Sequence, residues 1–222
     1  MSQRKVNKSR DTRPDVSELE PAIKECVRYI LCREGGKIPI KRGDINKHLN
    51  TVCQTPQNQV SAIIVEANKV LKKVYGYELL EVAANAGKQY IVILSQECKS
   101  ILPPIIDEHQ RKLLIAALMH IFMSGAPVKE EDMYKFLTDA GLLEENDHAS
   151  RKLLTTTFTR QMYLEYSKVK VTESNVTRCE FTWGQRAEHE VSKLFLLNKM
   201  AEAFGKTPDH WCEQYKEATR ET

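Results

Sequence analysis

Hydrophobic residues recur every three or four positions along most of the chain, a spacing typical of helices with one buried face. In the first half, a pair of glycines at 35–36 interrupts this pattern, and later segments become β-prone around Asn85-Ala86-Gly87. The elements predicted there are helices over 16–34, 42–50 and 56–75 and extended segments over 37–41, 77–82 and 89–94. Helix, short strand, two helices and a hairpin is the element order of a winged-helix domain.

The second half repeats this order without a clear residue-level repeat. The elements predicted there are helices over 111–123 and 130–140, a third helix beginning near Ser150, and strands over 162–170 and 178–183. A long helix over 185–204 and an amphipathic turn through Trp211 and Tyr215 are predicted after the hairpin. Two winged-helix units in tandem account for the whole pattern.

The predicted fold class is therefore mainly α with small β-hairpins, an α+β fold built from tandem winged-helix domains. Five basic residues and almost nothing apolar in the first fifteen positions predict a disordered tail. Pro103-Pro104 lies in a stretch that breaks both periodicities and predicts a stiff linker. The predicted organisation is a tail over 1–15, a first winged-helix domain over 16–96, a linker over 97–107 and a second winged-helix domain with C-terminal helices over 108–222.

Composition narrows the compartment and the class of protein. The chain has 222 residues, of which 41% are hydrophobic and 28% charged, with a net charge of +3. No run approaches a membrane span, and the polar, basic start lacks the apolar centre of a secretory signal, so we expect a soluble intracellular protein without a membrane partner. The six cysteines form no CxxC pair and no ligand spacing with histidine, which favours buried free thiols.

No arrangement of residues in the sequence indicates catalysis or a cofactor. The six histidines are scattered, and no phosphate-binding glycine loop occurs. His189 lies in the acidic and basic segment 186–190, but the HEXXH zinc pattern is absent, which favours a solvated helix face. We therefore expect a binding protein without catalytic residues, metal ligands or cofactors.

Two candidate binding surfaces emerge instead. The first is basic and lies on the third helix and hairpin of the second unit; its cations are Lys152, Arg160, Lys168, Lys170 and Arg178. Either it contacts the phosphates of duplex DNA without reading much sequence, or it is an ordinary solvated face. The second surface is apolar and consists of Tyr29, Ile30 and Leu31 on the first helix and of Leu194 and Leu197 near the C-terminus. Surplus apolar area of this kind indicates either a protein partner or packing between the two units.

Several sequence blocks resemble the MAGE (melanoma-antigen) homology domain. In the second half they read LLIAALMHIFMSGAPVKEEDMYKFLTDAGL, SRKLLTTTFTRQMYLEYSKV, EFTWGQRAEHEVSKL and TPDHWCEQYKEA, and the first half adds YILCREGGKIPIKRGDI. The resemblance covers residues 16–218. It is greatest to the single-copy form of invertebrates and fungi, the third non-SMC element of the Smc-five/six complex.

This resemblance implies a nuclear, chromatin-associated adaptor of the Smc-five/six complex without enzymatic activity of its own. Such proteins hold a RING-type ubiquitin ligase subunit through the first winged helix, where the family's leucine pair matches Ile30-Leu31 here. They hold a kleisin subunit through the second unit, for which Leu194 and Leu197 are the candidates, and they contact DNA during repair. The family's usual WGPR reads Trp183-Gly184-Gln185-Arg186 in this chain, without the proline that favours a helix start.

Two rival functions stay open on the sequence. The first is a MAGE adaptor that directs another RING ligase outside the Smc-five/six complex. The second is a free-standing winged-helix transcription factor, which needs base-reading side chains on an exposed third helix. The candidates for that role are Thr155, Thr156 and Thr159.

Overall fold

The computed structural model describes residues 16–82, 87–95, 107–125, 127–170 and 177–220. It is mainly helical with two small antiparallel sheets, so the predicted α+β fold is confirmed. The predicted tail over 1–15 and almost all of the predicted linker lie outside the described residues. Asp107, at the end of that linker, caps the next helix by accepting a hydrogen bond from the amide of His109.

The first unit contains three helices and a three-stranded sheet. Its elements are α1 (Val16–Glu34), β1 (Ile40–Lys41), α2 (Arg42–Cys53), α3 (Val60–Val70), the π-helical segment η1 (Leu71–Tyr75), β2 (Tyr77–Val82) and β3 (Gln89–Leu94). The strand order is β1-β3-β2, with every pair antiparallel. Both hairpin strands begin and end at the residues that the alternating pattern predicts.

The second unit repeats this arrangement and adds helices at its end. Its elements are α4 (Glu108–Ser124), β4 (Val128–Lys129), α5 (Glu130–Asp139), α6 (His148–Lys152), the π-helical segment η2 (Leu153–Thr157), α7 (Phe158–Arg160), β5 (Leu164–Lys170), β6 (Thr177–Trp183), α8 (Gln185–Glu190), α9 (Lys193–Phe204), the 3-10 turn η3 (Pro208–His210) and α10 (Cys212–Arg220). The strand order β4-β6-β5 matches that of the first unit. In both units the third helix contains a π-helical segment, which strengthens the duplication seen in the element order.

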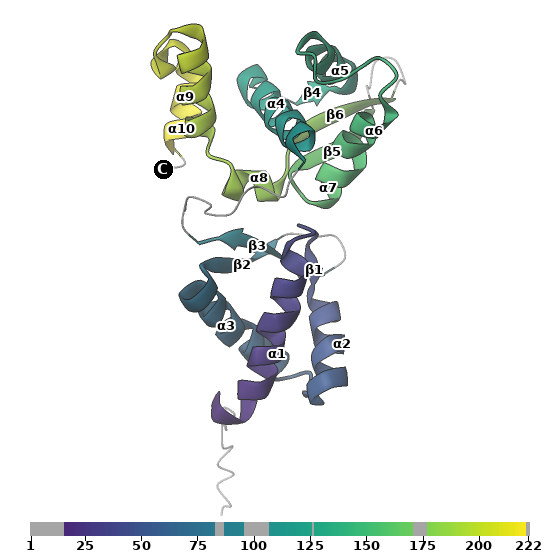
Figure 1. Ribbon diagram of the computed structural model, residues 1–222, viewed down its shortest axis with the longest axis vertical. Coiled ribbons are helices and arrows are strands. Elements are labelled where there is room, and N and C mark those ends of the chain that lie inside the picture. The colour runs from purple at the N-terminus through teal and green to yellow at the C-terminus, as the bar shows by residue number, and fades with distance from the viewer. Residues whose placement is uncertain (1–15, 83–86, 96–106, 126, 171–176, 221–222) are drawn as a thin grey trace, which may run out of the picture.

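The predicted continuous helix over 185–204 is wrong. The chain leaves the helical conformation at Val191, and Ser192 starts α9 by accepting a hydrogen bond from the amide of Phe195. A serine at this position satisfies one of the free amides at a new helix start, which favours a break over a continuous helix. The break turns α9 away from α8 and places it beside α10 (Figure 1).

Each unit has its own apolar core. In the first unit, α1 packs against both α2 and α3, and one face of the β2–β3 hairpin closes the core with Leu79, Tyr90 and Val92. In the second unit, α4, α5 and the third helix pack on the β5–β6 hairpin around Phe181, which is fully buried. The units are stacked end to end, and α8 of the second lies against β3 of the first (Figure 1).

Candidate functional site

A groove runs along the exposed side of α1 in the first unit. It has a volume of about 390 Å³ and is lined mainly by apolar side chains, including Ile23, Val27, Leu31, Cys32, Val70 and Tyr75. Lys24 and Arg28 lie at its edge, and each is paired with a glutamate of α1, Lys24 with Glu20 at 2.7 Å and Arg28 with Glu25 at 2.6 Å. Tyr75 is 49% exposed and the adjacent Val74 65%, so apolar surface continues beyond the groove. A groove of this size with an apolar lining suits a protein side chain or short helix better than a small polar ligand.

Only one of the three residues predicted on the first helix can contact a partner in this conformation. Leu31 is half-buried and lines the groove, whereas Ile30 is fully buried and Tyr29 is 5% exposed. The ring of Tyr29 lies between His48 and the guanidinium of Arg33, at 4.3 and 3.7 Å. Because α1 is packed on two sides by α2 and α3, its wide apolar arc belongs to the core. The prediction that Tyr29 and Ile30 form a binding surface is therefore wrong, because both side chains are buried.

The apolar residues predicted near the C-terminus are also largely core. Leu197 is fully buried against Phe122 and Ala218, so α9 and α10 are fixed to α4, and the prediction of Leu197 as a contact residue is corrected. Leu194 is half-buried beside the same cluster. The exposed apolar side chains of this region are Phe195 at 58%, Phe204 at 62% and Tyr215 at 38%. Phe195 and Phe204 are nine residues apart on α9 and therefore lie on opposite sides of that helix.

The predicted basic surface of the second unit is exposed, but its cations do not share one face. Four of them have no acidic partner among the described residues: Lys152, Arg160, Lys168 and Lys170. Alternation along β5 places Lys168 and Lys170 on the face of the hairpin that carries Tyr166 and Phe181, beyond the core. Arg178 pairs with Val169 on the opposite face and donates to Glu180 at 2.6 Å. Arg178 is therefore separated from the other four cations and neutralised locally.

The three threonines considered for base reading are poorly suited to that role. The hydroxyls of Thr155 and Thr159 donate to backbone carbonyls of their own helix, at 3.0 Å to Arg151 and 2.9 Å to Thr155. Both side chains are half-buried, and only Thr156 of the three is exposed. Their hydroxyl protons are thus engaged within the helix.

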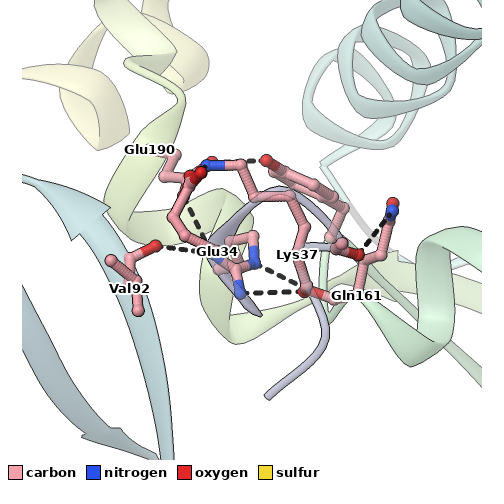
Figure 2. Close-up of polar contacts among 8 residues, drawn as sticks. Glu34, Lys37, Val92, Gln161 and Glu190 are labelled. Atoms are coloured by element: carbon pink, nitrogen blue, oxygen red, sulfur yellow. Dashed lines mark hydrogen bonds and ion pairs between the residues drawn. The ribbon is translucent and has the colours of Figure 1, made fainter. Parts of the chain in front are cut away.

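Polar groups of Lys37, Val92, Gln161 and Glu190 meet at the junction between the units (Figure 2). The residue that joins them is Arg186, which is 1% exposed. Its guanidinium donates to the backbone carbonyls of Gln161, Val92 and Lys37 at 2.8, 2.8 and 2.9 Å, and to the Glu190 carboxylate at 2.9 Å. Val92 and Lys37 belong to the first unit, whereas Gln161 and Glu190 belong to the second. A planar guanidinium with five N–H donors is well suited to join four acceptors that lie in different directions.

Further polar groups surround this arginine. Glu190 also lies 3.7 Å from the Lys37 ammonium and accepts a hydrogen bond from the Tyr163 hydroxyl. Burial, and then the negative charge of Glu190, raise the pKa of Tyr163, so its hydroxyl stays protonated and remains a donor. Glu34 at the end of α1 pairs with Lys37. Two carboxylates and two cations therefore balance each other across the junction.

The WGQR segment explains how Arg186 reaches this position. Trp183 donates to the Leu118 carbonyl at 2.9 Å and so fixes the end of β6 to α4. Gly184 comes so close to the preceding turn that a Cβ would lie 2.3 Å from the Met162 carbonyl oxygen. The Met162 carbonyl also accepts a hydrogen bond from the Arg186 amide at 2.9 Å, and the φ of Met162 is 65°. A glycine is therefore required for the start of α8 to lie against this turn.

The sequence reasoning missed Arg186 because it placed segment 186–190 on a solvated helix face, which is wrong for Arg186, Ala187 and Glu190. His189 in the same segment is exposed. One signal could have revealed the junction: residues 90–93 are apolar without alternation and all four are buried. A strand that is apolar on both sides is covered on both faces. Here the second face, with Val82, Ile91 and Ile93, lies at the junction and contacts Met162.

Other chemical features of the described residues are few. No group of three or more His, Cys, Asp or Glu side chains among them is placed to hold a metal ion. No helix in the described part of the chain has the length and apolar character needed to cross a membrane. The cysteines described are free, and burial raises the pKa of the Cys26 thiol to about 12. Cys32 and Cys212 are exposed, so the prediction of buried thiols is wrong for these two, while Cys98 lies outside the described residues.

Comparison with known proteins gives a consistent family. The chain matches the MAGE homology domain over residues 26–100 and 99–194. It is 34% identical to human trophinin and 33% identical to human melanoma-associated antigen D2, in each case over 92% of the chain but only 14% and 34% of those longer proteins. The chain thus spans about a third or less of the length of these relatives.

Two further matches concern chromosome proteins. The human non-structural maintenance of chromosomes element 3 homolog is 32% identical over 90% of this chain and 66% of its own length. A chain of the solved Nse1-Nse3-Nse4 complex superposes with a TM-score of 0.78 at 30% identity, covering 93% of this chain and all of that one. These matches and the two repeated units confirm the resemblance drawn from the sequence blocks. The chain belongs to the family of proteins that contain the MAGE homology domain.

Proposed function

We propose that this protein is a non-catalytic adaptor subunit of a Smc-five/six-type chromosome-maintenance complex and acts in the nucleus. One observation carries the proposal: the likeness to a chain of the Nse1-Nse3-Nse4 complex extends over 93% of this protein at 30% identity. Likeness over both units and the junction between them supports a shared way of assembling with partners. In this role the protein joins a RING-type ubiquitin ligase subunit, a kleisin subunit and duplex DNA.

The RING-type partner binds the groove beside α1. Leu31 is the matched leucine position that retains exposed surface, and it lies among Val27, Val70 and Tyr75, where an apolar side chain of a partner can be buried. Burying a leucine-sized side chain contributes about 1.5–3 kcal/mol, enough to make this groove the centre of an interface.

The kleisin partner binds the C-terminal helices of the second unit. Phe195 is exposed on the side of α9 opposite its buried residues, and half-buried Leu194 lies next to it. Phe204 is exposed at the C-terminal end of the helix, where its ring lies 6.2 Å from that of Trp211. Aromatic side chains of this size are typical centres of helix-in-groove interfaces. Leu197 stabilises this surface from inside the fold.

Duplex DNA contacts the second unit through its backbone phosphates. Lys152 and Arg160 on the third helix and Lys168 and Lys170 on the hairpin are the cations available for this contact. Lysine and arginine neutralise phosphate without reading base identity, and the threonine hydroxyl protons are engaged within the helix. Binding is therefore expected to be nonspecific in sequence and to weaken steeply with salt.

Reconstitution with the candidate partners tests the proposal. The purified chain is mixed with a RING-type subunit and a kleisin subunit of the same organism, and assembly is measured by size-exclusion chromatography with light scattering. Leu31→Asp should abolish RING binding, and Phe195→Asp with Phe204→Asp should abolish kleisin binding. Val52→Asp, at a position 53% exposed on α2, is the matched control and should leave both intact. Failure of the wild-type chain to bind either subunit would refute the proposed function.

DNA contact has its own test. Fluorescence anisotropy with a labelled duplex, repeated at several salt concentrations, gives affinity and salt slope. Lys152→Glu combined with Arg160→Glu should weaken binding to duplexes of any sequence and make the salt slope shallower. Affinity unchanged by these two reversals would remove DNA contact through this face from the proposal.

The alternative is an adaptor for another RING ligase outside such a complex. This alternative is supported by the identity to trophinin, which at 34% is comparable to the 32% identity to the chromosome element 3 homolog. Recovery of a RING partner without a kleisin in affinity purification from cells distinguishes this alternative. The transcription-factor hypothesis receives little support, since no exposed base-reading set is found on the described third helix of the second unit.

A further inference from the structure

The guanidinium of Arg186 makes hydrogen bonds both within its own unit and to the first unit. Its Nε atom donates to the Gln161 carbonyl at 2.8 Å, and one Nη1 bond reaches Glu190 at 2.9 Å. Glu190 is four residues further along the chain and is fixed in turn by Tyr163. The second unit therefore holds the guanidinium at both Nε and Nη1.

The remaining donors point into the first unit and bind two separate elements. Nη1 donates to the Val92 carbonyl on β3 at 2.8 Å, and Nη2 donates to the Lys37 carbonyl in the turn after α1 at 2.9 Å. A neighbouring bond from Gln161 Nε2 to the Gly36 carbonyl, at 3.4 Å, approaches the same turn. Because the acceptors lie on two elements, rotation as well as separation of the units would break these directional bonds.

The apolar part of the junction has a different effect. Val82, Ile91 and Ile93 cover the second face of the first hairpin, and among the described residues of the second unit Met162 packs on this cluster. Apolar burial favours contact between the units but is nondirectional, so this packing does not by itself define an angle. The angle between the units therefore depends on the directional contacts. Arg186 makes the two shortest of these, at 2.8 and 2.9 Å, compared with 3.4 Å from Gln161 to Gly36 and 3.7 Å between Lys37 and Glu190.

Two backbone turns at the junction adopt the left-handed conformation without glycine. Lys37 has φ of 54° and Met162 has φ of 65°, and the carbonyl of each accepts a hydrogen bond from Arg186. Non-glycine residues persist in this conformation where surrounding contacts fix them. Both sides of the junction are thus shaped to present a carbonyl to the same arginine.

We propose that Arg186 is the positioning residue that fixes the orientation of the two winged units. It thereby sets the distance between the groove beside α1 and the binding surfaces of the second unit. The proposal rests on the proposed function only for what those surfaces bind. Loss of the guanidinium leaves two folded units that sample a range of relative orientations.

The free chain can test this with two of its own cysteines. Cys32 on α1 and Cys212 at the start of α10 are both exposed, one in each unit, and accept spin labels once Cys53, Cys98 and Cys179 are replaced by serine. Double electron–electron resonance then measures the distance between the units. The otherwise unsubstituted protein should give one narrow distance peak, and Arg186→Gln should lose it while circular dichroism remains that of a folded protein. Arg160→Gln, at an exposed arginine of the same unit, should keep the narrow peak.

Arg186→Lys separates geometry from charge. Lysine keeps the positive charge beside Glu190, so the second unit is expected to fold, but one ammonium cannot reproduce the fork that joins Val92 and Lys37. Loss of the narrow peak in Arg186→Lys supports the proposal. If Arg186→Gln does not fold, Arg186→Lys alone provides the test. A narrow peak at the wild-type distance in Arg186→Lys, or in a folded Arg186→Gln, would overturn it. Because no partner is present, these outcomes are independent of whether the proposed function holds.

Discussion

Replacing Gly184 by alanine should strongly destabilise the second unit. The added Cβ would lie 2.3 Å from the Met162 carbonyl oxygen and 2.9 Å from the carbonyl carbon of Tyr163, whereas ordinary contact begins at 3.4 Å. The two backbones must therefore separate by about 1 Å. That shift strains the hydrogen bonds from the Gly184 amide to Tyr163 and from the Arg186 amide to Met162, both 2.9 Å long. Overpacking of about 1–3 kcal/mol and two weakened hydrogen bonds of about 1 kcal/mol each give an expected loss of about 3 kcal/mol.

Tryptophan fluorescence during urea unfolding measures this loss in the relevant unit. The chain has two tryptophans, Trp183 and Trp211, and both lie in the second unit, so their signal reports its unfolding. Gly43→Ala is the matched control, because a Cβ there meets no heavy atom within 4 Å and the position is helical. It should leave the tryptophan transition unchanged and stabilise the first unit by up to about 1 kcal/mol. A Gly184→Ala transition within about 0.5 kcal/mol of wild type would refute the steric argument.

Three further predictions concern single side chains. Hydrogen bonds from Arg28 and then His48 hold the pKa of Glu25 at about 2, below its ordinary 4.5. Its stabilisation of the first unit is therefore complete above pH 4.5 and lost as the pH falls towards 2, and Glu25→Gln should flatten this dependence in thermal melts followed by circular dichroism. Burial lowers the pKa of His120 below 6.5, and its Nε2 atom is buried without a partner in the described structure, so the second unit should lose stability as the pH falls below 6.5. His120→Leu should remove that loss in the tryptophan signal; a persistent loss would assign it to another group. Ile63→Ala, at a fully buried position, should cost the first unit about 2–5 kcal/mol in urea unfolding, and a cost under 1 kcal/mol would contradict its place in the core.

Local patterns predicted the elements well wherever one periodicity dominated. Both strands of the first hairpin, Tyr77–Val82 and Gln89–Leu94, begin and end as predicted, because alternation and a glycine-containing turn agree there. The break between α8 and α9 was missed because the apolar spacing continues through it. It depends on the cap at Ser192 and on the fixed position of Lys193, which lies 5.1 Å from the Trp183 ring and pairs with Glu188 and Glu217. Such tertiary contacts are not visible in a helical pattern.

The candidate sites were harder to predict because sequence patterns show which residues are apolar but not how many neighbours cover them. Ile30 and Leu31 are adjacent and chemically alike, yet one is fully buried and the other lines the groove. The difference comes from α2 and α3 packing on two sides of α1. Arg186 is the opposite case, since an arginine is rarely buried unless its donors are satisfied. Three of its four acceptors are backbone carbonyls, which no side-chain motif reveals.

The two hairpins share a topology but differ in which of their residues stay exposed. In the first unit, Val82, Ile91 and Ile93 make the second face apolar, and the second unit covers it. In the second unit, Lys168 and Lys170 lie on the same face as the core residue Phe181, but beyond the core, where their charge is exposed. A phosphate backbone can approach the second hairpin without disturbing the junction, whereas approach to the buried face of the first would require the units to separate. The two hairpins therefore differ in role: the first joins the units, whereas the second carries exposed cations that the proposed DNA contact uses.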